Sequence, residues 1–280
     1  MAGGFMALLA TFFALPASAA EATVHSSSVG QVNESQESED GNSHAVMSYY
    51  AIFYGPSVQD PSLLQPNERG EQSADRPLLL KNYLTLGYDF NREVEMSATA
   101  YGTLVPVAGH SAVLHDPYLR IAFNSIAHTD KINLYGDVRL HLPTSTDSKN
   151  ADLRSGIQLF QITSMIPSDS RFGFGIYTSE RVNFYGPAGN GSDLVLYVGP
   201  NISYQVSNSI ALTTLYEMGA SHTYGDETWG LNNDGTDLEP GVSWDITPNL
   251  NVNPYLNIYT GNQVTLQSTS IGMTLSWKML

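Results

Sequence analysis

Residues 131–142 read KINLYGDVRLHL and alternate strictly between two kinds of side chain. Every second position holds an apolar residue or a glycine, namely Ile132, Leu134, Gly136, Val138, Leu140 and Leu142. The positions between them hold Asn133, Tyr135, Asp137, Arg139 and His141. Successive side chains of a β-strand point to opposite faces of the sheet, so this stretch predicts a strand with one apolar and one polar face.

The same two-residue period continues through most of the chain from residue 45 onward, and no segment shows the 3.6-residue apolar repeat of an amphipathic helix. Residues 250–260 and 171–184 are further clear cases, although Glu180 interrupts the apolar face of the second and is expected near a membrane edge. We predict twelve strands, at about 45–54, 79–90, 93–105, 116–127, 131–142, 153–166, 170–184, 194–206, 209–221, 237–246, 249–260 and 263–278.

The connections between these strands alternate in length. Those that follow even-numbered strands are short, as in residues 91–92 and 207–208, whereas most of the others are long, as in 55–78 and 222–236. Alternating short and long connections between amphipathic strands of about ten residues are typical of a closed, antiparallel transmembrane β-barrel. An even number of strands places both chain ends on the side of the short turns, which is the periplasmic side in such barrels.

Composition excludes several other classes. The 280 residues contain no Cys, which excludes a disulfide scaffold, a thiolate metal site and a cysteine nucleophile. The formal net charge of -15 with only 12 Lys and Arg argues against nucleic-acid binding, because phosphate neutralisation needs clustered basic residues. Beyond the first 20 residues no apolar run of about 18 residues occurs, so the sequence predicts no membrane-spanning helix there.

The N-terminus predicts export. Residues 1–19 have an apolar run that Pro16 ends, and the small residues Ala17, Ser18 and Ala19 follow as a cleavage site. Residues 20–44 are rich in Ser, Glu, Gln and Asn without apolar periodicity, which predicts a disordered periplasmic leader. We therefore divide the chain into a signal peptide (1–19), a leader (20–44) and a barrel (45–280).

With these features the chain resembles the Gram-negative outer-membrane β-barrel proteins of the porin-like class. The resemblance covers residues 45–280 and includes a C-terminal alternating strand, 271–280, in which Trp277 stands three residues before the end. It implies an all-β transmembrane barrel in the cell outer membrane, with outer-membrane lipid around it and the barrel-assembly machinery as a partner. It implies no cofactor.

If the apolar face meets lipid, the polar face lines the lumen. Four basic residues then fall in the outer half of the lumen on four adjacent strands: Arg120, Arg139, Arg154 and Arg181. Glu217 and Glu239 fall at similar depth nearer the opposite wall. Rings of side-chain charge select ions and solutes in pores, so we predict a basic wall facing an acidic wall. The expected function is passive passage of ions or small hydrophilic solutes.

Two other functions stay open. One is a non-conducting structural or surface-interaction barrel, with the loops 55–78 and 222–236 as its contact surface. The other is an outer-membrane hydrolase, for which His110 and Ser111 are the leading candidates because a nucleophilic serine needs a nearby base.

Weaker candidates for chemistry are His141 beside Thr144 and Ser145, and His222 near Asp226 and Glu227. Residues 232–237 faintly resemble a calcium-binding loop but lack its full spacing, so a simple turn is expected there. We predict no catalytic residue, no metal site and no cofactor.

Overall fold

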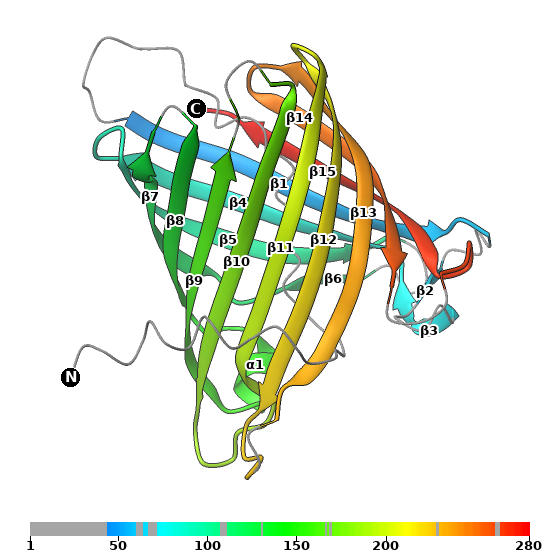
Figure 1. Ribbon diagram of the computed structural model, residues 1–280. Helices are drawn as coiled ribbons and strands as arrows, with labels where there is room; N and C mark the ends of the chain where they lie inside the picture. Colours follow the sequence, from blue (N-terminus) through cyan, green and yellow to red (C-terminus); the bar gives the residue numbers. More distant parts are fainter. Residues whose placement is uncertain are drawn as a thin grey trace.

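The computed structural model describes residues 44–59, 64–66, 72–106, 111–129, 131–165, 167, 170–227, 230–260 and 264–280. The chain forms one antiparallel β-barrel, drawn in Figure 1. Its strands are β1 (His44–Ser57), β4 (Leu79–Asp89), β5 (Val94–Val105), β7 (Tyr118–His128), β8 (Ile132–His141), β9 (Leu153–Met165), β10 (Phe172–Tyr185), β11 (Ser192–Ser207), β12 (Ile210–Thr223), β13 (Asn232–Thr247), β14 (Leu250–Tyr259) and β15 (Thr269–Lys278). The other elements are β2 (Leu64–Pro66), β3 (Gln72–Pro77), β6 (Ser111–Leu114) and α1 (Thr146–Asn150).

The barrel closes on itself through its first and last strands. Each barrel strand pairs antiparallel with its two neighbours, and β1 pairs with both β4 and β15. Of the thirteen strands in this sheet β6 pairs only with β5, so twelve strands form the ring. Closure leaves no unpaired strand edge, which is the condition for a sheet to span a bilayer. The prediction of a closed twelve-stranded antiparallel barrel is confirmed.

The two faces of the sheet have the reverse of the polarity that a soluble protein shows. Outward-facing apolar side chains are well exposed, as in Leu86 (55 %), Met96 (49 %) and Ile271 (46 %), whereas the lumen-facing Thr99 (1 %) and Thr274 (0 %) are buried. A soluble domain buries its large apolar side chains and leaves most polar ones in water. An apolar outer surface around a polar interior is the arrangement of a barrel in lipid.

Several elements differ from the strands predicted from sequence. The predicted strand 116–127 is β7 from Tyr118 onward, and the short β6 precedes it. Pro117 has no N–H group to donate to a ladder, and the Asp116 side chain binds the loop that carries α1, so the strand is interrupted there. The last strand, β15, begins at Thr269 instead of 263.

The predicted turn at residues 232–237 is wrong, because β13 already begins at Asn232. Its pairing with β12 shifts in register between Met218 and Ala220, and Gly235 has φ of 108°. Glycine tolerates this conformation, so the strand continues through an irregularity instead of ending in a loop.

The helix α1 is one turn in the connection between β8 and β9. Ser145 caps it, since the Ser145 side chain accepts a hydrogen bond from the backbone N–H of Ser148 at 3.2 Å. Within the residues that the structure describes, no helix has the length and apolar character needed to cross a membrane. The predicted signal peptide (1–19) and all of the predicted leader (20–44) except His44 lie outside the described residues, as does His110.

Candidate functional site

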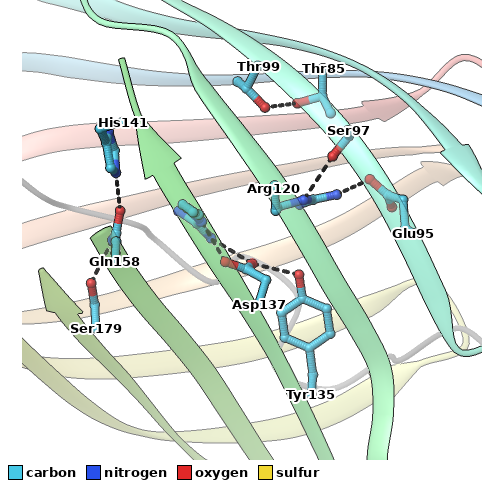
Figure 2. Close-up of polar contacts among 11 residues, drawn as sticks. Thr85, Glu95, Ser97, Thr99, Arg120, Tyr135, Asp137, His141, Gln158 and Ser179 are labelled. Atoms are coloured by element: carbon cyan, nitrogen blue, oxygen red, sulfur yellow. Dashed lines mark hydrogen bonds and ion pairs between the residues drawn. The ribbon is translucent and has the colours of Figure 1, made fainter. Parts of the chain in front are cut away.

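The lumen of β7–β10 carries a row of polar side chains at matched register. Arg120 on β7 pairs with Arg139 on β8, Arg139 with Gln158 on β9, and Gln158 with Arg181 on β10. Partners opposite each other on antiparallel strands point to the same face, so three of the four predicted basic residues lie in one row across four adjacent strands. Figure 2 shows part of this row with its polar contacts.

Arg139 is held by an ion pair on its own strand. Its Nε lies 2.7 Å and its Nη2 2.9 Å from the two carboxylate oxygens of Asp137. The Tyr135 hydroxyl donates to the same carboxylate at 2.7 Å, and the guanidinium lies 4.7 Å from the centre of the Phe160 ring. Both charged side chains are buried, and the two-fold hydrogen bonding offsets their desolvation.

Arg120 has a carboxylate partner as well. It forms an ion pair with Glu95 on β5, and its Nε donates to the Ser97 hydroxyl at 3.1 Å (Figure 2). Arg120 and Arg139 are therefore each neutralised by a neighbouring carboxylate. The sequence analysis did not assign Glu95 or Asp137 to the site, although strand alternation places both on the polar face.

Arg181 and Arg154 lie in different surroundings. Arg181 faces the lumen on β10 and donates through Nε to the Asn183 side chain at 2.8 Å. Arg154 stands at the start of β9 with 66 % of its side chain exposed, and it pairs with Asp152 in the adjoining loop at 2.6 Å. The structure therefore brings Arg120, Arg139 and Arg181 together and leaves Arg154 at the barrel mouth.

Three carboxylates gather on the lumen faces of β12 and β13, which follow β10 and β11 around the ring. Glu217 and Asp237 are direct partners across these strands, and Glu239 is the partner of Leu215. Glu217 and Glu239 are each only 5 % exposed. Asn257 on β14 donates from Nδ2 to Asp237 at 3.1 Å and to Glu239 at 3.4 Å. The sequence analysis did not assign Asp237, because the predicted strand began at that residue.

Polar ladders join the charged groups along the lumen. The Gln158 amide donates to the Ser179 hydroxyl at 2.7 Å and its carbonyl lies 2.8 Å from His141 Nε2, while Thr85 and Thr99 share a hydrogen bond of 2.8 Å (Figure 2). Strand alternation places all of these side chains on the lumen face, where they can reach one another. His141 is thus bound into the wall by an amide, and the nearby Ser145 caps α1.

Two tyrosines fill the lumen over glycines. Tyr177 is fully buried opposite Gly199, and a Cβ added at Gly199 would come within 2.1 Å of the Tyr177 ring. In the same way Tyr255 lies opposite Gly272, where a Cβ would come within 2.2 Å of its ring. Phe160, Tyr197 and Leu215 pack around Tyr177. The glycines therefore make room for large rings that narrow the lumen.

At the barrel mouth, Asp116 organises the loop that carries α1. Its carboxylate accepts hydrogen bonds from the backbone N–H groups of Thr144 and Ser145, each at 2.8 Å, and from the Ser148 hydroxyl. Burial favours the neutral acid, but the hydrogen bonds outweigh it, so the pKa of Asp116 is lowered. Asp116 therefore stays ionised and anchors the loop at neutral pH.

Backbone contacts link this loop to its neighbours. The Gly186 N–H donates to the Asp152 carbonyl at 2.8 Å, Asn190 donates to Ala151 at 3.2 Å, and Tyr224 donates to Gly191 at 2.8 Å. The connections after β8, β10 and β12 thus form one continuous rim at the end of the barrel where α1 lies (Figure 1).

The remaining candidates for chemistry have other partners. His222 lies 2.6 Å from Asp193 through Nδ1, and Ser111 is an exposed residue at the start of β6. In the described segments, no group of three or more His, Asp or Glu side chains is placed to hold a metal ion.

The comparison with solved structures relates this fold to known channels. An outer membrane channel from Pseudomonas putida F1 is similar over 85 % of this chain and 96 % of its own, with a TM-score of 0.52 and 10 % sequence identity. A KdgM porin in complex with disordered oligogalacturonate (TM-score 0.45, 8 % identity, 85 % of this chain and 100 % of its own) was also found. The NanC porin is similar over 84 % of this chain and 100 % of its own, with a TM-score of 0.46 and 8 % sequence identity.

No protein-family model matches the sequence, and no curated protein matches it either. The chain therefore shares its fold with the channel from Pseudomonas putida F1, at 10 % sequence identity.

Proposed function

We propose that this protein is a narrow passive pore of the cell outer membrane for ions or small hydrophilic solutes. The observation that carries the proposal is the closed barrel with an apolar outer face and a lumen lined by charged and polar side chains. A polar lumen inside an apolar band is what aqueous passage across a bilayer needs. In this proposal lipid surrounds the barrel, which the barrel-assembly machinery inserts.

The two charged walls support selection by charge. Arg120 and Arg139 lie on β7 and β8, four to six strands around the ring from Glu217 and Glu239 on β12 and β13, whereas Arg181 on β10 is two strands from β12. Because Glu95 and Asp137 neutralise two of the arginines, we propose that the carboxylates of β12 and β13 dominate the field and favour cations. Arg154, exposed at the mouth, would act on solutes before they enter.

A second candidate function is a non-conducting structural barrel. It is favoured by the burial of long lumen side chains, since Tyr177 (0 %), Glu239 (5 %) and Arg139 (7 %) leave little exposed surface inside. The mouth loops would then be the working surface. An integral-membrane hydrolase has no such observation in its favour.

Single-channel conductance separates these candidates. Protein refolded from residue 20 onward is placed in a planar bilayer under a salt gradient, and Tyr177→Ser is measured beside it. A pore gives stepwise conductance, with larger steps for Tyr177→Ser because the ring over Gly199 is removed. A folded protein that is silent in both forms contradicts the pore and supports the structural barrel.

A further inference from the structure

The charged residue Glu180 lies on the outward face of the barrel. Glu180 lies on β10 with the outward-facing residues Phe174, Ile176 and Val182, and its cross-strand partners are the outward residues Leu159 and Leu196. Among the Asp, Glu, Lys and Arg residues in regularly alternating parts of the described barrel strands, it alone alternates in phase with the outward apolar residues, whereas Arg154 and Asp193 lie at register shifts near the mouth. Its carboxylate oxygen Oε2 is buried and has no hydrogen-bond partner.

The sequence pattern predicts Glu180 near a membrane edge. In the structure Glu180 lies inside the apolar band instead. Two further outward apolar residues on the same strand, Val182 (42 % exposed) and Phe184 (47 %), lie beyond it toward the mouth. At about 3.3 Å per residue and a tilt of about 40°, Glu180 lies roughly 10 Å inside Phe184. A charged group at such a depth is costly against lipid and marks pairing or function.

Other polar side chains surround Glu180 on this face. Gln161 on β9 is the cross-strand partner of Thr178, and Thr163 is the partner of Ile176. Thr178 and Glu180 are two residues apart on β10, so their side chains share the outward face. We define the outward patch by these four residues: Gln161, Thr163, Thr178 and Glu180. Elsewhere, the outward Asn82 is satisfied within the barrel by the Tyr49 hydroxyl at 2.6 Å.

We propose that the outward patch is the contact between two copies of this chain in the membrane. The patch holds an acceptor-only carboxylate beside an amide that can donate, so it is complementary to itself. Two copies related by an axis along the membrane normal meet at equal depth through the same strands. The Gln161 amide of each copy then donates to the Glu180 carboxylate of the other. This inference does not depend on conduction.

The absence of cysteine makes a direct test possible. Thr178→Cys places a single thiol in the patch, and Leu84→Cys places one on the outward face of β4, far around the ring. Each variant is refolded into phosphatidylcholine vesicles, oxidised and resolved by denaturing electrophoresis. We expect a disulfide-linked dimer for Thr178→Cys and none for Leu84→Cys.

The second arm tests whether Glu180 holds the contact. Introducing Glu180→Leu into Thr178→Cys removes both interchain hydrogen bonds, and dimerisation measured by energy transfer in vesicles should weaken about tenfold. Heat-modifiable electrophoretic mobility verifies that every variant is folded. The inference is overturned if folded Thr178→Cys stays monomeric, if Leu84→Cys cross-links equally, or if Glu180→Leu leaves dimerisation unchanged.

Discussion

The two charged walls of the lumen satisfy their charges in different ways. On β7 and β8 each central arginine has a carboxylate partner, and Asp137 lies 2.7 Å from Arg139. On β12–β14 the donor shared by Asp237 and Glu239 is the neutral amide of Asn257. The first wall is a set of charge pairs that lose stability when one member is removed, whereas the second places three carboxyl groups close together. If the proposed pore function holds, the first wall serves stability and the second serves selection.

Breaking the first wall should have the largest effect on stability. Asp137→Ala leaves the Arg139 guanidinium buried without its carboxylate and leaves the Tyr135 hydroxyl without its acceptor. Removing one partner of a buried pair costs about 3–5 kcal/mol of unfolding free energy. Denaturant unfolding measures this loss, and the double variant with Arg139→Met should recover part of it. A loss below about 1 kcal/mol for Asp137→Ala would show that the pair is structurally unimportant.

Filling a glycine site next to a lumen tyrosine should have a smaller effect. In Gly199→Ala the new methyl group meets the Tyr177 ring and Leu215, and overpacking of this kind costs about 1–3 kcal/mol. Gly230→Ala is the matched control, because nothing lies within 4 Å of its added Cβ. The same unfolding titration compares the two variants, and equal stabilities would contradict the packing described for Tyr177.

Changing the charge on either wall should shift the ion selectivity of the pore, measured as the reversal potential. Glu217→Gln and Glu239→Gln keep an acceptor but remove charge, so their reversal potentials should move toward anions with little loss of stability. The charge reversals Arg139→Glu and Arg181→Glu should move selectivity toward cations. Between these two, Arg139→Glu should also unfold more easily, since Arg139 has the buried ion pair. If the conducting protein shows no shift in any variant, the walls do not set selectivity.

The smallest global effect is expected at the mouth. Asp116→Ala removes three hydrogen bonds from the α1 loop, so trypsin should cut after the exposed Lys149 about tenfold faster while global unfolding changes little. Ser148→Ala is the graded control because it removes one of the three. Unchanged cleavage in Asp116→Ala would mean that the loop is anchored by other contacts.

The pH dependence of this anchor follows from its lowered pKa. A carboxyl group whose pKa falls on folding stabilises above its unfolded value, about 3.9, and loses this contribution as pH drops through the lower folded value. Fluorescence anisotropy of a dye on Asp147→Cys should therefore stay constant from neutral pH to about 4 and fall below it. In the Asp116→Ala background this transition should vanish.

Most of the barrel could be predicted because alternation is a local property. Residues 131–142 and 250–260 each assign every side chain to a face without any tertiary information, and β8 and β14 follow them closely. The same alternation placed Arg120, Arg139 and Arg181 on the lumen face. Prediction from the local sequence was wrong where the interacting partners lie far apart in the chain. At residues 115–117, the contact of Asp116 with Ser148 accompanies the interruption of a strand.

The sequence by itself determined the all-β class, the faces of the strands and the ring of twelve, because a two-residue period and alternating connections contain that information. Only the tertiary structure decided which charges cancel. Glu95 neutralises Arg120 because the register of β5 and β7 brings their side chains within hydrogen-bond distance, and register depends on pairing across the whole ring. The depth of Glu180 in the apolar band likewise follows from the neighbours that flank it on β9 and β11.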